Sequence, residues 1–213
     1  MAQRRAWRQS LVRVRLYVEG GSSGGLDSRC RKAFSEFFKK AGLSGHMPKV
    51  IACGSRTEAF KRFRTALTQA DSEAIPLLLV DAETHVAPQS ASWQHLNSRD
   101  GWQRPSEALD EQAHLMVQIM ESWFLADVPS LEKYFGNNFR SASLTNRESL
   151  EDVPKNDVLN QLKLASRDSQ KGTYDKGSHS FAILAQIDPE KVIQRSRFAK
   201  RLIDTLKSYL IPT

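Results

Sequence analysis

Three carboxylates stand where two apolar segments of this sequence end. Glu19 follows Leu11–Val18, and Asp81 and Glu83 follow Ile75–Val80. Such apolar segments are typical of buried strands, and open α/β sheets bind their ligands beyond the carboxyl ends of the strands. If the two strands are neighbours, the sequence predicts that the three carboxylates meet in one crevice.

Clustered carboxylate oxygens are the ligands that Mg²⁺ and Mn²⁺ prefer. Asp81 and Glu83 are two residues apart at a strand end, so their side chains leave the same face and can share a metal ion. The chain has a formal net charge of +7, with 31 Lys and Arg against 24 Asp and Glu, and such a charge attracts nucleic acids. Together these features predict metal-dependent phosphodiester chemistry. The competing interpretation is that acids end many strands without any function.

Two further acids are candidate metal ligands. Asp27 lies just beyond the glycine-rich segment Gly20–Gly25, where it is either a ligand or the cap of the helix that follows. Glu121 follows the apolar segment Leu115–Met120. Glu121 reaches the crevice if that segment is a strand of the same sheet, and it lies on a solvated face if the segment is a helix.

A polar segment, Tyr174–His179, carries another candidate. Lys176 in this segment suits the stabilisation of the negative charge that develops on a phosphate during hydrolysis. His179 is a second candidate for contact with the substrate. Lysine and histidine are also common in surface loops, so exposure without a function is the alternative for both.

Residues 84–112 are predicted to form a long loop, and loops of this length are usually functional or disordered. Arg99, Arg104 and Trp102 suit a surface that follows a nucleic acid backbone and stacks on its bases. Trp93 lies in the same segment. Local packing is the alternative role for at least one of the two tryptophans.

The elements that must position these residues follow from periodicity. Residues 11–18 alternate in polarity, which indicates a strand, and 49–54 and 75–80 are further apolar strands. Helical spacing of apolar residues over 30–41 and 59–70 predicts a helix after each of the first two strands. This order predicts an α/β fold with a mainly parallel central sheet of about four strands, flanked by helices.

The second half of the chain is predicted to be mostly helical. We expect helices at four places, separated by polar loops: 123–135 with a break near Pro129, 155–165, 179–186 and 197–210. The chain then forms a single domain of residues 1–213. This domain consists of a loose basic arm (1–10), an α/β core (11–135) and a mostly helical C-terminal part (136–213).

Length and composition fit a globular domain with one good core. The 213 residues are 40% hydrophobic and 26% charged. No apolar run reaches the roughly 20 residues that cross a bilayer. Cys30 and Cys53 are too few for a disulfide framework, so we expect buried free thiols and a cytoplasmic location.

Several motifs resemble those of known families. Glu19-Gly20 and Asp81-x-Glu83 resemble the Toprim domain of topoisomerases, primases and OLD-type nucleases, although that pattern has Asp where Glu83 stands. Nearly the whole chain resembles a bacterial Toprim-like family known as domain of unknown function 4276. The motifs that carry this resemblance are Val18-Glu19-Gly20, Cys30-Arg31-Lys32, Val80–Glu83, Trp93–Leu96, Arg99–Trp102, Met116–Gln118, Met120–Trp123, Lys176-Gly177 and His179.

The resemblance implies a compact Toprim-like fold and Mg²⁺-dependent nuclease activity. It also implies a bacterial phage-defence or mobile-element context with an ATPase partner. In the OLD-type pattern, Asp27 and Lys176 correspond to a further acid and a distal lysine.

We therefore expect an endonuclease that hydrolyses DNA or RNA. Glu19, Asp81 and Glu83 would bind one or two Mg²⁺ or Mn²⁺ ions, and Glu121 or Asp27 would complete a second site. The alternative is a non-catalytic Toprim-like partner that docks on an ATPase and regulates it. The sequence predicts no particular oligomeric state.

Overall fold

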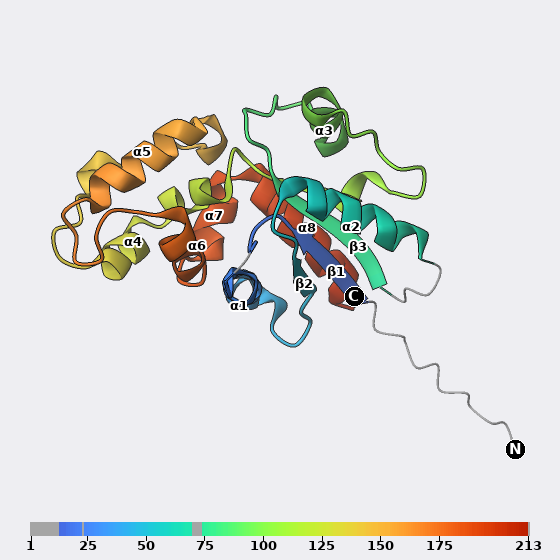
Figure 1. Ribbon diagram of the computed structural model, residues 1–213, viewed down its shortest axis with the longest axis horizontal. Helices are drawn as coiled ribbons and strands as arrows, with labels where there is room; N and C mark the ends of the chain where they lie inside the picture. Colours follow the sequence, from blue (N-terminus) through green and yellow to red (C-terminus); the bar gives the residue numbers. More distant parts are fainter. Residues whose placement is uncertain (1–12, 23, 70–73, 213) are drawn as a thin grey trace, which may run out of the picture.

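A sheet of four parallel strands forms the centre of the molecule (Figure 1). The computed structural model describes residues 13–22, 24–69 and 74–212, so the predicted arm over 1–10 lies outside it. The strand order is β2-β1-β3-β4. The strands are β1 (Arg13–Val18), β2 (Lys49–Ala52), β3 (Ala74–Asp81) and β4 (Ala113–Met116). The predicted α/β class with a parallel sheet of four strands is confirmed.

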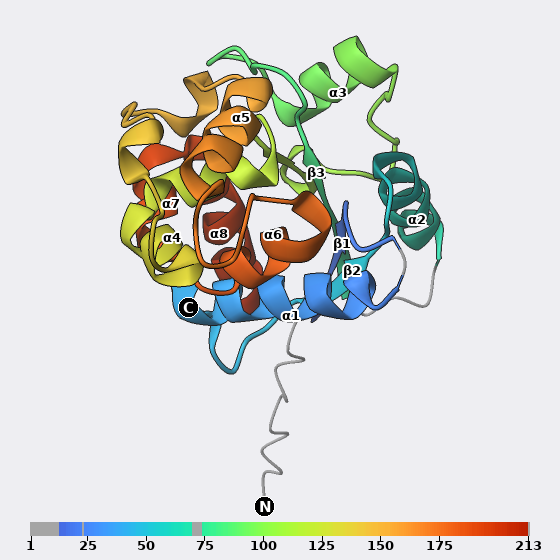
Figure 2. The same cartoon turned by 60° about the vertical axis from the view of Figure 1, so that its left-hand side comes forward.

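Helices cover both faces of the sheet. The α-helices are α1 (Leu26–Phe38), α2 (Arg56–Thr68), α3 (Ser92–Asp100), α4 (Val128–Phe135), α5 (Lys155–Ser166), α6 (Lys176–Leu184), α7 (Pro189–Arg195) and α8 (Arg197–Leu210). α2 and α3 lie on one face of the sheet, and α1 and α8 lie on the other (Figures 1 and 2). The helical lobe, α4 to α7, lies beyond the carboxyl ends of the strands (Figure 1).

The two apolar segments of the sequence are neighbouring central strands. Val14, Leu16 and Val18 of β1 are buried in the same cluster as α1 and α8, whereas Tyr17 is buried on the α2 side. β3 is buried on both faces over nearly its whole length, as its continuous apolar sequence predicts. In the ladder, Val18 lies beside Leu79. The carboxyl ends of β1 and β3 are therefore level, which is what the predicted site requires.

The prediction of a long loop over 84–112 is wrong, because α3 lies within it. Trp93 and Leu96 of α3 are three residues apart and buried. The helix ends at Gly101, whose φ of 69° suits the left-handed conformation that closes many helices. Because this short helix contains two large buried apolar residues, the helical spacing is not repeated often enough in the sequence to predict a helix.

The sequence allowed the segment Leu115–Met120 to be either a strand or a helix, and the structure divides it between the two. β4 ends at Met116, and the 3₁₀-helix η3 (Met120–Ala126) begins after three further residues. The helix expected over 123–135 is therefore two helices, η3 and α4. Pro129 stands at the start of α4, where proline is tolerated because the first N–H groups of a helix have no intrahelical partner.

The helices predicted over 155–165 and 197–210 are confirmed as α5 and α8. α6 begins earlier than predicted, so Lys176 lies in its first turn and not in a loop. α7 has seven residues, too few to give a clear period in the sequence. α8 returns to the sheet, where Arg201 donates a hydrogen bond to the carbonyl oxygen of Ala113 at 3.2 Å.

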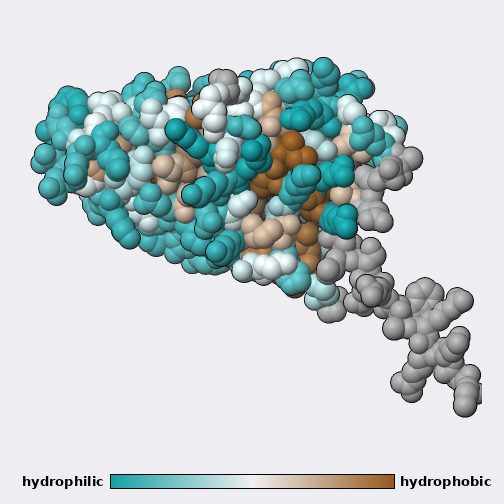
Figure 3. All heavy atoms as spheres, turned by 60° about the horizontal axis from the view of Figure 1, so that its bottom comes forward, coloured by the Kyte–Doolittle hydropathy of each residue, from teal (hydrophilic) through white to brown (hydrophobic). Residues whose placement is uncertain are grey.

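Within the described ranges, no helix is long and apolar enough to cross a membrane. Cys30 and Cys53 are buried and free, as predicted. The surface on the α1 side is mostly hydrophilic over the helical lobe, and a hydrophobic strip lies nearer the sheet (Figure 3). The helical lobe therefore presents mainly polar groups to solvent on this side.

His114 in β4 gives a prediction about stability and pH. Burial, and then the nearby Arg201 guanidinium, lower the pKa of His114 from 6.5 to about 3. Below pH 6.5 the unfolded chain binds a proton that the folded chain does not, so stability is full above that pH and falls as the pH drops toward 3. We expect His114→Leu to reduce this slope by about 1.4 kcal/mol per pH unit. Urea unfolding at several pH values measures it, and equal slopes in the two proteins would contradict the prediction.

Candidate functional site

Three carboxylates converge at the carboxyl ends of β1 and β3. Glu19 follows β1, Asp81 is the last residue of β3, and Glu83 lies two residues further on. One oxygen of each lies within 4.8 Å of the other two. Asp81 is buried, and Glu19 and Glu83 are partly exposed. The structure therefore brings together the three acids that the sequence singled out.

Backbone geometry fixes Glu19 beside Asp81. The Asp81 N–H donates a hydrogen bond to Glu19 Oε2 at 3.0 Å. The next residue, Gly20, exchanges backbone hydrogen bonds with Gly54 at 2.8 and 2.9 Å. Gly20 has a φ of 128°, and a Cβ there would lie 3.2 Å from the Phe181 ring. A glycine is therefore needed at the point where β1 turns into the site.

A fourth acid, Glu121, lies next to Asp81. The N–H of Met120 donates to Asp81 Oδ1 at 2.8 Å, and this bond holds the start of η3 against the end of β3. Glu121 is fully buried, and its Oε1 accepts hydrogen bonds from Tyr174 at 3.0 Å and Ser180 at 3.1 Å. Its other oxygen, Oε2, is buried without a hydrogen-bond partner.

Lys176 bridges the two buried acids. Its Nζ lies 3.6 Å from Asp81 Oδ2 and 3.6 Å from Glu121 Oε2. The lysine reaches them from the first turn of α6, and its side chain is 60% exposed. A largely exposed ammonium group thus faces the buried acids from the solvent side.

Glu83 takes part in the site through an unusual backbone conformation. Its φ is 69°, a left-handed value that non-glycine residues rarely adopt. Its N–H donates to the carbonyl oxygen of Gln118 at 2.7 Å, and its carboxylate forms an ion pair with Lys155. Backbone outliers of this kind cluster at functional sites.

Burial dominates the electrostatics of the site. Desolvation raises the pKa of Glu19, and it raises the pKa of Asp81 well above its usual range. The charges of Glu19 and Glu121 add to the shift of Asp81, and Lys176 opposes it. Burial also acts to raise the pKa of Glu83, but the hydrogen bond and charge of Lys155, together with the charges of Arg99 and Lys176, outweigh it and the net shift is downward.

The pKa of Lys176 is raised by this surplus of negative charge. Desolvation acts to lower it, and the charges of Glu121, Asp81, Glu19 and Glu83 together overcome that effect. Lys176 therefore stays protonated at neutral pH. The site keeps its carboxylates close together with only partial compensation by cations.

Arg56, which the sequence analysis missed, joins three parts of the site. Its Nη2 pairs with Asp100 Oδ2 at 2.6 Å, and its Nη1 lies 3.8 Å from Glu19 Oε2 and donates to the Asp81 carbonyl oxygen. Arg56 is the first residue of α2, directly after the N-cap Ser55, whose Oγ accepts from the Glu58 N–H at 3.2 Å. A helix that follows a parallel strand begins at the carboxyl edge of the sheet, which is the signal that could have identified Arg56.

Asp27 does not join the cluster. The predicted cap is wrong, because α1 begins at Leu26 with Gly25 as its N-cap and without a side-chain cap. Asp27 instead lies in the first turn, where it pairs with Arg31 at 2.9 Å and its side chain is 47% exposed. A hydrogen bond from the Ser28 backbone N–H, and then one from Arg31, lower the pKa of Asp27.

The other predicted substrate contacts lie around the site at different depths. Arg99 is near enough to Glu83 to lower its pKa, and it pairs with Asp100. Arg104 is further out, 3.5 Å from Asp110. His179 packs edge-on against Phe135, with ring centres 5.6 Å apart. The structure does not bring His179 or Arg104 to the carboxylates.

Trp93 and Trp102 have packing roles. Trp93 is buried and donates a hydrogen bond to the Leu109 carbonyl oxygen at 3.1 Å. Trp102 stacks on Phe60, with ring centres 4.2 Å apart, and Arg56 lies over its ring at 5.0 Å. Trp102 thereby links the site to the outer side of α2.

The donor set fits a hard divalent cation. Glu19, Asp81 and Glu83 supply only carboxylate oxygens, the donors that Mg²⁺ and Mn²⁺ take, from positions close enough to reach one ion. Burial, and then the charges of neighbouring acids, raise the pKa of Glu19 and Asp81, and a bound cation would favour the ionised form of both groups. The Oε2 of Glu121, which accepts no hydrogen bond and lies 3.6 Å from Lys176 Nζ, is a further oxygen donor beside Asp81.

Comparison with protein families matches residues 18–207 to one family model, described as a domain of unknown function, DUF4276. Comparisons with curated proteins and with solved structures find no significant match. The matched range contains the four acids of the site together with Arg56 and Lys176. Because the match covers most of the chain, this protein belongs to the DUF4276 family.

Proposed function

We propose that this protein is a metal-dependent endonuclease that hydrolyses phosphodiester bonds of DNA or RNA. The observation that carries the proposal is the convergence of Glu19, Asp81 and Glu83 within 4.8 Å at the carboxyl edge of a parallel sheet. Lys176 lies beside these acids, and the net charge of +7 favours a polyanionic substrate.

In this proposal Glu19, Asp81 and Glu83 hold Mg²⁺ or Mn²⁺, with Glu121 available for a second ion. When bound, such an ion polarises a phosphate oxygen and lowers the pKa of a bound water. The chain's own groups supply the rest. Lys176 binds a phosphate oxygen and stabilises its developing charge, and Arg56 keeps Glu19 in position.

The resemblance to Toprim nucleases agrees with this proposal and suggests a cytoplasmic protein of a phage-defence or mobile-element system. One observation favours the alternative of a non-catalytic partner that regulates an ATPase. Arg56, Lys155 and Lys176 already supply positive charge to the carboxylates, so the network can persist without an ion. Titration with Mn²⁺ separates the two proposals. The nuclease needs a bound metal ion, whereas the regulatory partner does not, so a lack of Mn²⁺ binding would favour the partner.

The test is incubation of the purified protein with plasmid DNA, single-stranded DNA and transfer RNA, with Mn²⁺, Mg²⁺ or EDTA. We expect cleavage of at least one substrate with a divalent ion and none in EDTA. Thermal unfolding should show a higher melting temperature with Mn²⁺, because an ion that binds only the folded chain stabilises it. Absence of both cleavage and stabilisation would exclude the nuclease and favour the regulatory partner.

A further inference from the structure

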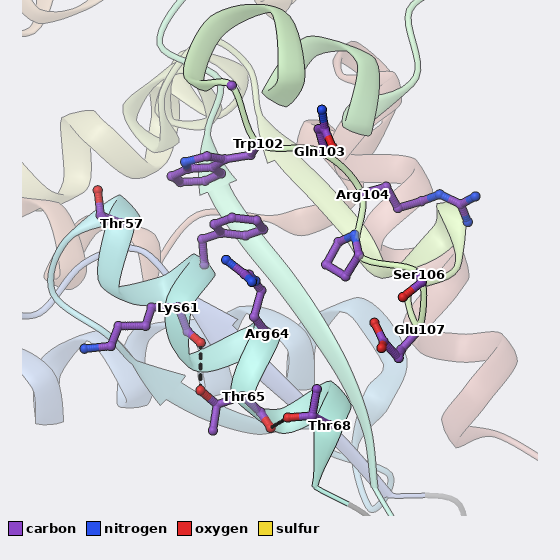
Figure 4. Close-up of a pocket in the computed structure, with 13 residues that line it drawn as sticks. Thr57, Lys61, Arg64, Thr65, Thr68, Trp102, Gln103, Arg104, Ser106 and Glu107 are labelled. Atoms are coloured by element: carbon purple, nitrogen blue, oxygen red, sulfur yellow. Dashed lines mark hydrogen bonds between the residues drawn. The ribbon is translucent and has the colours of Figure 1, made fainter.

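A groove lies along the outer side of α2, next to the candidate site (Figure 4). It has a volume of about 970 Å³ and is bounded by α2 and by the segment 101–107 that follows α3. α2 contributes Lys61 and Arg64 to its lining, and the segment contributes Trp102 and Arg104. We infer that this groove binds the sugar-phosphate backbone of a single strand of DNA or RNA, an inference that rests on the proposed nuclease function.

Arg56 connects the groove to the carboxylates. Its guanidinium lies 3.8 Å from Glu19 on one side and over the Trp102 ring on the other. The groove-lining face of α2 starts one residue later, at Thr57, and continues to Thr68, with a rise of about 1.5 Å per residue. A strand with its scissile phosphate at the carboxylates can therefore continue along α2 for its next few nucleotides.

The charge of the lining suits a polyanion. The lining has three cations, Lys61, Arg64 and Arg104, and one acid, Glu107. Lys61 has no ion-pair partner among the described residues. Arg64 lies 5.7 Å from the centre of the Phe60 ring, so its charged group is held at the groove. In Figure 4, Arg64 lies below the stacked rings, and Lys61 and Arg104 extend to opposite sides.

Trp102 and Phe60 form part of the wall of the groove, and we do not assign them a role in stacking on bases. Trp102 and Phe60 stack at 4.2 Å with 8° between their planes, and Arg56 also lies over Trp102. With the rings engaged inside the chain, Lys61 and Arg64 remain for the ligand, and contacts to phosphates bind without regard to sequence. The groove volume of about 970 Å³ is near the upper end of the range of roughly 300–1,000 Å³ for ligand pockets, which suits a few nucleotides of one strand.

The test compares two double variants that each remove two exposed cations. Lys61→Ala/Arg64→Ala changes the groove, and Arg29→Ala/Lys32→Ala changes exposed residues of α1 on the other face of the sheet. Alanine is the best helix former, so neither change threatens its helix. Fluorescence anisotropy in EDTA measures binding of labelled single-stranded DNA, single-stranded RNA and duplex DNA, with the metal-dependent reaction stopped.

We expect the groove variant to bind single strands about tenfold more weakly and to lower the slope of log K against log salt by about 1.4, or about 0.7 for each lost phosphate contact. The control should retain wild-type affinity and slope, and single strands should bind more tightly than duplex. Equal weakening in both double variants, or no binding by the wild type, overturns the groove assignment. If the wild type cleaves and the groove variant binds single strands as tightly as the wild type, this inference is overturned and the nuclease proposal stands. Groove-dependent binding without any cleavage supports the groove and defeats the nuclease.

Discussion

Asp81→Asn is expected to lower the rate of Mn²⁺-dependent cleavage at least about a thousandfold, because a bound metal contributes several kcal/mol to catalysis. Asp81 is the buried member of the three converging carboxylates. The variant keeps the oxygen that accepts the Met120 N–H at 2.8 Å and loses the negative charge. Time courses on the substrate that the wild type cleaves best measure the effect.

The same variant is expected to stay folded. Burial raises the pKa of Asp81, so the ionised carboxylate opposes folding, increasingly as the pH rises from the unfolded pKa of about 3.9 through the raised value. In EDTA at neutral pH, Asp81→Asn should therefore melt at the wild-type temperature or above it. Mn²⁺ should raise the melting temperature of the wild type and leave that of the variant unchanged.

Asp204→Asn is the matched control for this experiment. Asp204 pairs with Lys200 on the surface of α8, and its side chain is 57% exposed. This variant should cleave and respond to Mn²⁺ like the wild type. Normal cleavage by Asp81→Asn would remove Asp81 from the site, and a variant that fails to fold in EDTA would contradict the stability argument.

Lys176→Met is expected to slow cleavage about a hundredfold to a thousandfold, the usual effect of removing one group that stabilises the charge of a transition state. Lys176 Nζ lies 3.6 Å from both Asp81 and Glu121, so it is close to any phosphate that reaches these acids. Methionine keeps the apolar stem and removes the charge. Loss of this charge leaves the carboxylates more negative, so Mn²⁺ should still raise the melting temperature at least as much as in the wild type.

This combination separates Lys176 from the metal ligands, whose loss removes both cleavage and the response to Mn²⁺. Lys176→Arg should recover part of the rate, because it restores the positive charge with a different shape. Lys163→Met on the exposed face of α5 is the control and should behave like the wild type. A Lys176→Met variant with an undiminished rate would show that the lysine only neutralises the acids.

The central sheet is predictable from sequence because strands and amphipathic helices leave clear periods. β1 alternates in polarity and β3 is continuously apolar, and both patterns follow directly from burial. α3 and α7 leave no such signal. α3 has nine residues with Trp93 and Leu96 as its large buried side chains, and α7 has seven residues, so neither repeats its pattern over enough turns.

The carboxylates of the site could be predicted because strand ends meet at one edge of a parallel sheet. Arg56 and Lys155 could not be predicted as directly, because their proximity to Glu19 and Glu83 depends on how whole elements pack. The burial of Glu121 depends in the same way on hydrogen bonds from Tyr174 and Ser180, more than fifty residues along the chain. Sequence patterns record which residues end a strand, whereas tertiary packing decides which distant side chains come to meet them.

The late position of α6 and α8 in the chain has a consequence for synthesis. A nascent chain that has emerged as far as β4 carries every strand of the sheet, but the face that α8 covers is still exposed, and Lys176 is still absent from the acids. Nascent chains emerge at about 5–20 residues per second, so this intermediate lasts for seconds at the ribosome. Full assembly of the acids with their lysine therefore waits until α6 and α8 have emerged.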